Sequence, residues 1–163
     1  MSSLLSFPNP VNEKAARTVA AGVLLLSLLA LIPGVHWLVL PIALGFLLRV
    51  ASGPRFSPLG QLATRVVAPR LGRPRLVPGP PKRFAQAIGA TLTSVAAIGY
   101  FGFGATGFSS VLLVLVIIAA GLESGFALCL GCVLFGWLMR AGLIPGEICQ
   151  DCNTVGLRYS QNG

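Results

Sequence analysis

Four long apolar runs decide what this chain of 163 residues can fold into. Hydrophobic residues make up 55% of the sequence and charged residues only 10%, whereas an ordinary globular domain is about 25% charged. About 20 apolar residues suffice for a helix to cross a bilayer. We therefore expect one all-α integral membrane domain over residues 1–163, without a separate soluble catalytic domain. Its four transmembrane helices are predicted at about 14–32, 35–50, 84–104 and 109–139.

The second run is the weakest span. Its uncharged part is short for a bilayer, and Pro41 interrupts it, so a re-entrant segment fits as well as a full crossing. Trp37 lies where an interfacial aromatic anchor belongs, and Arg49 at the far end is expected to snorkel towards water. His36, at the start of the run, is expected to be an interfacial side chain rather than a ligand.

Residues 49–83 form a basic loop between the second and third spans. The loop contains no acid, and its basic residues are Arg49, Arg55, Arg65, Arg70, Arg73, Arg75, Lys82 and Arg83. The positive-inside rule places this loop in the cytoplasm, so both the N-terminus and the tail, residues 140–163, are expected there. Residues 57–70 predict an interfacial helix, and the proline-rich stretch after it predicts a stiff linker.

The distribution of the basic residues along the chain indicates a lipid partner. The net charge is +8, but the basic residues are concentrated between apolar segments. Anionic headgroups are therefore the expected partner, and no nucleic acid is expected. The localisation predicted from these patterns is a multi-pass protein of the cell (cytoplasmic) membrane.

All four cysteines lie in two C-x-x-C pairs, Cys129 with Cys132 in the last apolar run and Cys149 with Cys152 in the tail. Cβ atoms at i and i+3 of a helix are about 5 to 6 Å apart, and a disulfide needs about 3.5 to 4.5 Å, so closing the first pair requires local distortion. Gly131 is the residue expected to permit it. Nine extended residues reach about 30 Å, so the tail pair can fold back onto the first pair.

Three chemistries fit the four cysteines. The first is dithiol exchange or transfer of sulfur between the pairs, with all four as candidate catalytic residues. The second is a structural zinc site with Cys129, Cys132, Cys149 and Cys152 as thiolate ligands, because the C-x2-C-x16-C-x2-C spacing fits one. The third is inert packing of cysteine as a small hydrophobe. Acids beside the tail pair, Glu147 and Asp151, disfavour thiolate.

Glu123 is the acid within an apolar run, where such a residue is costly and usually faces a bundle interior or water. On one continuous helix it lies about 120° from Cys129 and opposite Cys132, which separates it from the cysteine site. Gly121 and Gly125 flank it as a close-crossing element. A small transporter or channel component built on Glu123 is therefore an alternative, and so is a protonated acid bonded to a neighbouring hydroxyl.

Three segments of the sequence resemble a known family of small bacterial membrane proteins, the domain of unknown function 4395 (DUF4395). These segments are FPNPVNEKAAR, ESGFALCLGCVLF and IPGEICQDC. The resemblance implies an actinobacterial or related cytoplasmic-membrane protein, often encoded near thioredoxin-like and thiosulfate sulfurtransferase proteins. The family's intramembrane C-x-G-C falls on Cys129, Gly131 and Cys132, and its tail pair on Cys149 and Cys152, without an assigned role.

The resulting hypothesis is a thiol-redox or sulfur-relay accessory at the cytoplasmic face of the membrane. Cys149 and Cys152 are expected to exchange with a thioredoxin-like or sulfurtransferase partner, and Cys129 and Cys132 to hold the membrane-side dithiol. No cofactor is required by this hypothesis, whereas the alternative requires zinc. Whether the relay turns over as an enzyme is left open by the sequence.

Overall fold

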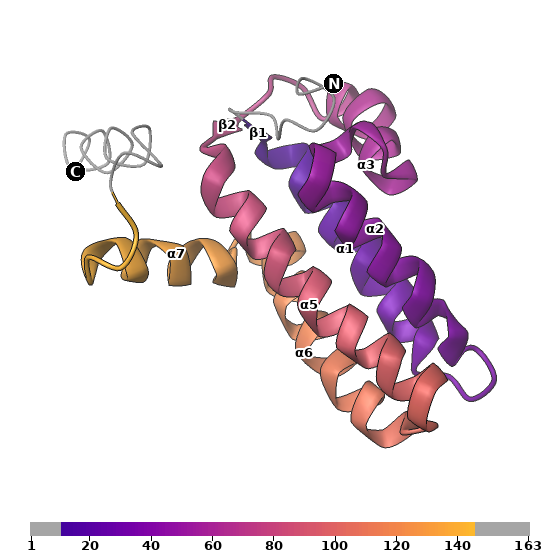
Figure 1. The fold of residues 1–163 in the computed structure, drawn as a ribbon. Helices are drawn as coiled ribbons and strands as arrows, with labels where there is room; N and C mark the ends of the chain where they lie inside the picture. Colours follow the sequence, from indigo (N-terminus) through magenta and orange to yellow (C-terminus); the bar gives the residue numbers. More distant parts are fainter. Residues whose placement is uncertain (1–10, 146–163) are drawn as a thin grey trace.

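The computed structural model describes residues 11–145, which form an elongated helical bundle (Figure 1). Its elements in chain order are β1 (Val11–Asn12), α1 (Glu13–Ala30), η1 (His36–Leu38), α2 (Val39–Ser52), η2 (Gly53–Arg55), α3 (Pro58–Leu62), η3 (Ala63–Val67), α4 (Ala68–Arg70), β2 (Leu76–Val77), α5 (Gly79–Phe103), α6 (Thr106–Phe126) and α7 (Leu130–Arg140).

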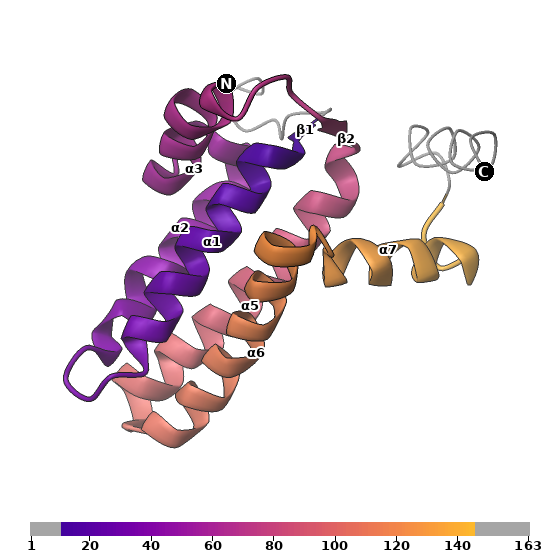
Figure 2. The ribbon, with the colours of Figure 1, turned by 180° about the vertical axis from the view of Figure 1, so that it is seen from behind.

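Four long helices form the bundle. Helix α2 packs against α5, α1 packs against α6, and α5 packs against α6. Both views show the short helices α3 and α4 with the β1–β2 pair at one end of the bundle, and α7 running crosswise away from it (Figures 1 and 2). The prediction of an all-α architecture is confirmed apart from that single two-residue pair of strands.

A clamp at the basic end fixes where α1 begins. The Asn12 side chain accepts a hydrogen bond from the Lys14 backbone N–H at 3.0 Å, which caps the helix, and Glu13 occupies the first turn, next to the positive end of the helix dipole. Strands β1 and β2 pair antiparallel, and the Glu13 carboxylate lies 2.9 Å from Arg75. The stretch expected to be a stiff linker is thus tied to the start of α1, and α5 begins at Gly79 rather than at 84.

The opposite end of the bundle contains a polar contact that differs from the sequence prediction. His36 is only 4% exposed, and its Nε2 lies 2.8 Å from the Ser109 hydroxyl, with the Tyr100 ring against it. A neutral imidazole offers one donor and one acceptor, so a hydroxyl can satisfy it inside the bundle. The expectation of an interfacial histidine is therefore wrong, whereas Trp37 beside it is exposed as an interfacial anchor would be.

Small residues on α5 let the helices approach closely, as the composition of this segment predicts. A Cβ on Gly89 would lie 2.4 Å from the Phe46 ring of α2. Pro41 does not interrupt α2, because it lies in the first helical turn, where its missing N–H is not needed.

The apolar run 109–139 is not one helix. Helix α6 ends at Phe126, Ala127 adopts a left-handed conformation with φ of 57°, and α7 begins after Cys129. A run of about thirty residues exceeds the length that crosses a bilayer and must tilt, break or protrude. In the structure it breaks, and the break lies directly before the C-x-x-C pair.

Among residues 11–145, three helical stretches are long and apolar enough to cross a membrane, namely 36–70, 79–103 and 106–126. Large apolar side chains are exposed along the sides of the bundle, among them Leu25, Ile98 and Val111. Exposed apolar surface of that extent is typical of a protein whose solvent is lipid. Helix α1 has 18 residues but carries Glu13, Lys14 and Arg17 in its first turns, and α7 has 11 residues.

Gly131 has a packing role that can be tested. A Cβ at this position would lie 2.5 Å from the Cα and Cβ of Ala85 on α5, whereas a Cβ on Gly136 of the same helix meets nothing within 4 Å. We expect Gly131→Ala to lower the free energy of unfolding in detergent by about 1 to 3 kcal/mol, because α7 must move off α5. Gly136→Ala is the matched control and should leave stability unchanged or slightly raised. Equal effects of the two changes would contradict this packing.

Candidate functional site

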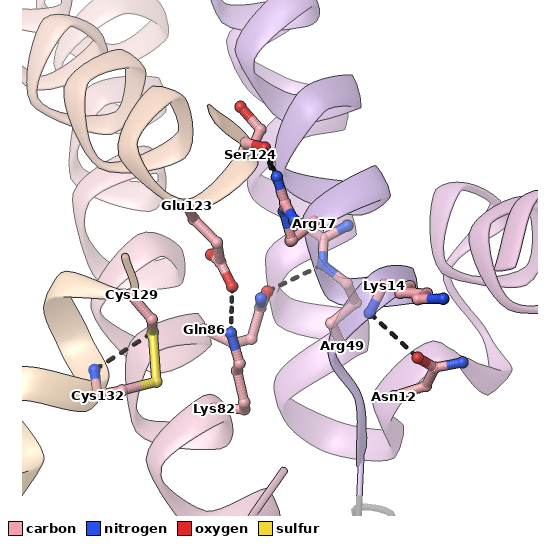
Figure 3. Close-up of polar contacts among 10 residues, drawn as sticks. All are labelled: Asn12, Lys14, Arg17, Arg49, Lys82, Gln86, Glu123, Ser124, Cys129 and Cys132. Carbon is pink, nitrogen blue, oxygen red and sulfur yellow. Dashed lines mark hydrogen bonds and ion pairs between the residues drawn. A yellow bond between two sulfur atoms is a disulfide. The ribbon is translucent and has the colours of Figure 1, made fainter. Parts of the chain in front are cut away.

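The candidate site lies at the basic end of the bundle, where α7 leaves it, and its polar side chains are drawn in Figure 3. Cys129 and Cys132 are joined by a disulfide, with their Cα atoms 5.2 Å apart. That separation falls within the range usual for disulfides. The first cysteine pair of the sequence is therefore a disulfide in this structure.

The helix break, rather than a distortion at Gly131, brings the two sulfurs together. Cys129 is extended, with φ −89° and ψ 102°, and precedes the first residue of α7. It is the N-cap of α7, and its Sγ accepts a hydrogen bond from the Cys132 N–H at 3.3 Å. Gly131 instead packs against Ala85, so the predicted role of Gly131 is replaced by contact with α5.

The two sulfur-bearing residues differ in accessibility. Cys129 is 8% exposed and counts among the buried residues, whereas Cys132 is only partly buried. Both line a hollow of about 580 Å³ between α7 and the start of α5, which Lys82 and Glu13 also line. Cys132 is thus the more exposed of the two cysteines.

Glu123 and Lys82 form a buried ion pair between α6 and α5. The Lys82 Nζ and Glu123 Oε1 lie 2.5 Å apart, and Figure 3 shows the two side chains pointing toward each other. Lys82, which was assigned to the cytoplasmic loop, lies in the first turn of α5 and is 8% exposed. The acid is therefore paired with a cation, and the prediction of a protonated acid bonded to a hydroxyl is wrong.

The break also changes how Glu123 relates to the cysteines. On a continuous helix the acid would face away from Cys132, but the chain turns after Phe126. Glu123 and Cys129 both line a largely apolar cavity of about 330 Å³ between α1, α5, α6 and α7. The prediction that Glu123 stands apart from the cysteine site does not hold.

Arg49 is a further buried cation at this end. It is 5% exposed, donates from Nε to Gln86 Oε1 at 2.9 Å and from Nη1 to Ser57 at 3.1 Å, and stacks on the Phe46 ring at 4.6 Å. The expectation that Arg49 snorkels outward is therefore wrong. Sequence reasoning also missed Gln86, for which the polar position within an apolar helix was the available signal.

Arg17 of α1 holds the end of α6. Its guanidinium donates to the Ser124 carbonyl at 2.9 and 3.2 Å and to the Gly125 carbonyl at 3.3 Å. Carbonyls at a helix C-terminus carry partial negative charge and lack intrahelical partners, so a cation is favoured there. This contact stabilises the C-terminus of α6 at its position just before the cysteine pair.

The tail pair, Cys149 and Cys152, lies outside the described residues. Within residues 11–145 no group of three His, Cys, Asp or Glu side chains is arranged to hold a metal ion. The zinc hypothesis requires both pairs, and the described residues include two of its four proposed ligands, Cys129 and Cys132.

Comparison with known proteins adds the family. The model of the family described as domain of unknown function (DUF4395) matches residues 11–140, which cover most of the chain. The chain belongs to DUF4395. The family match ends at Arg140, so it takes in the C-x-x-C pair of Cys129 and Cys132 but not the tail pair. No curated protein and no solved structure gives a significant match.

The Lys82–Glu123 pair should behave as a coupled unit. Removing either partner of a buried ion pair leaves an uncompensated charge, so we expect Glu123→Gln or Lys82→Met alone to cost about 3 kcal/mol of unfolding free energy in detergent. The double variant should recover most of that loss, because no charge is then left unpaired. Glu13→Gln is the control, since the side chain of its partner Arg75 is 70% exposed, and it should cost less than about 1 kcal/mol. Additive losses in the double variant would contradict the pairing.

Proposed function

We propose that this DUF4395 protein is a thiol-redox or sulfur-relay accessory at the cytoplasmic face of the cell membrane. The observation that carries the proposal is the disulfide between Cys129 and Cys132 at the start of α7. Cysteine pairs spaced C-x-x-C at a helix N-terminus favour thiolate chemistry, because the helix dipole and free N–H groups stabilise negative charge there.

The proposed membrane arrangement has four spans, α1, α2, α5 and α6, with both termini in the cytoplasm. Its support is the basic character of the end of the bundle that carries α3, α4 and β2, together with the positive-inside rule. Helix α7, which leaves the bundle crosswise and exposes Leu134 and Trp137, then lies near the inner interface. In this arrangement the cysteine pair faces the cytoplasmic side.

The proposed exchange begins at Cys132, the more accessible sulfur. A thiolate of the tail pair or of a thioredoxin-like partner attacks Cys132 and forms a mixed disulfide, and Cys129 leaves as a thiolate that then takes up a proton. A second thiolate of the attacking pair breaks the mixed disulfide and releases Cys132. The attacking dithiol thus becomes a disulfide, and Cys129 and Cys132 become a dithiol.

The surroundings of Cys129 suit a leaving thiolate. As the N-cap of α7 it already accepts a hydrogen bond from the Cys132 N–H, and Lys82 lines the same hollow. A nearby cation and a helix N-terminus are the two features that usually favour the thiolate form of a cysteine. The burial of Cys129 acts in the opposite direction, so the charged surroundings matter more here than at an exposed cysteine.

The proposed order of attack predicts which single variant traps a cross-link. In Cys129→Ser, Cys132 has lost its partner, so mild oxidation with glutathione disulfide should link it to Cys149 or Cys152. In Cys132→Ser the remaining Cys129 is buried, and the same treatment should give several-fold less of a link to the tail. Peptide mapping by mass spectrometry without reduction measures both products. The double variant Cys149→Ser and Cys152→Ser is the control that must lack any link.

Other outcomes would overturn this function. If neither single variant forms a link to the tail, and all cysteines react equally slowly with a maleimide before and after dithiothreitol treatment, the relay is wrong. One zinc per reduced chain, lost in Cys132→Ser, would support the four-thiolate structural site instead. Ion flux into proteoliposomes that disappears in Glu123→Gln would support the transporter.

A further inference from the structure

Arg49 carries a buried positive charge with which no acid of the described chain forms a direct ion pair, and Glu123, which is bonded to Lys82, acts on it only from a longer distance. Within residues 11–145 the acids are Glu13 and Glu123, and each is already within ion-pair distance of another cation, Arg75 and Lys82 respectively. Arg49 donates only to neutral groups in the hydrogen bonds that the structure gives, and its Nη2 is buried with no partner among the described residues. A buried charge of this kind is costly unless a counter-ion is present.

The space beside Arg49 has a largely apolar wall that contains basic and amide side chains. A cavity of about 200 Å³ lies between α1, the start of α5 and the turns that follow α2. Its wall contains two basic side chains, Arg49 and Lys82, and no acidic one. The wall also contains the amides of Gln86 and Asn12, whose oxygens already accept hydrogen bonds from Arg49 and Lys14, so their NH₂ groups remain as donors.

We propose that this cavity binds a tetrahedral oxyanion of the phosphate or sulfate type. The guanidinium of Arg49 offers a planar fork suited to paired oxygens, and Lys82 adds a point charge beside it. The oxyanion can be a free ion or the phosphate of a lipid headgroup, since the cavity lies at the basic end of the bundle. Lys82 also lines the hollow that contains the cysteines, but oxyanion binding requires no cysteine, so it can be tested separately from the proposed function.

Two features of the wall favour an oxyanion over water alone. Water can accept hydrogen bonds from the donors of the wall but supplies no negative charge beside Arg49, whereas an anion accepts the hydrogen bonds and supplies that charge. The wall residues come from several parts of the chain, with Asn12 before α1, Thr64 in η3 and Gln86 on α5. An anion bound there would therefore hold the clamp segment, the short helices and the bundle together, and its binding should stabilise the whole fold.

Thermal unfolding of the full chain in lipid-free detergent tests the proposal. Sodium phosphate and sodium sulfate are each titrated at constant ionic strength against sodium chloride. We expect a saturable rise in Tm of about 5 to 10 °C at a hundredfold excess over Kd. Arg49→Gln should abolish this rise, and Arg65→Gln, which removes an exposed charge from the same basic segment, should retain it. If Arg49→Gln does not fold, Lys82→Met serves as the second variant. We expect its Kd for phosphate or sulfate to be at least tenfold higher than that of the unaltered chain.

A parallel arm separates the two sources of the oxyanion. Short-chain phosphatidylglycerol that raises Tm at concentrations at which glycerol phosphate and inorganic phosphate do not would assign the site to a lipid headgroup and support the proposal. Equal effects of the soluble ions would support a free oxyanion. A Tm of the unaltered chain that responds to phosphate and sulfate no more than to chloride would overturn the proposal. A Tm response to phosphate or sulfate that appears only in the double variant Glu147→Gln and Asp151→Asn would also overturn it. That result would mean that a tail carboxylate occupies the cavity in the unaltered chain.

Discussion

The buried ion pair between Lys82 and Glu123 is the contact on which the arrangement of the site depends. It joins the first turn of α5 to the last turns of α6, and it is possible only because α5 begins before the point where the apolar run starts. Charges are expensive to bury, so the pair fixes the relative position of the two helices more strictly than apolar packing alone. The ion pair thus holds the end of α6 beside the start of α5, where the cavities and the cysteine pair lie.

The break after α6 divides the long apolar run into two helices, α6 in the bundle and α7 outside it. Arg17 holds the carbonyls at the end of α6, Ala127 turns the chain, and Cys129 caps the next helix. Without the turn, two cysteines three residues apart on one helix would have sulfurs poorly placed for a bond. The same turn places Glu123 and Cys129 on the wall of one cavity. A single interruption thus gives rise to both the disulfide and its charged surroundings.

The sequence located α1, α2 and α5 to within about five residues, because a lipid solvent demands long apolar runs and the punctuation at Gly34 and Gly104 is strong. It predicted one helix over 109–139, where the structure has α6 and α7. It also identified the cysteine pair. It failed for His36 and Arg49, which it placed at interfaces because isolated polar residues at the ends of apolar runs usually lie there, and for Lys82, which it placed in the cytoplasmic loop. Each of them instead bonds to a residue far along the chain, Ser109, Gln86 or Glu123, and such pairing cannot be read from local spacing.

The location of Lys82 couples the charged cluster to the proposed thiol chemistry. Its side chain is bonded to Glu123 and lines both the hollow that contains the cysteines and the cavity beside Arg49. In the disulfide state neither sulfur carries charge, and Glu123 is the acid that the described residues place within ion-pair distance of Lys82. A thiolate at Cys129 would introduce a second negative charge near the same ammonium group. Opening the disulfide would therefore weaken the hold of Glu123 on Lys82, and the redox state would act on the packing between α5 and α6.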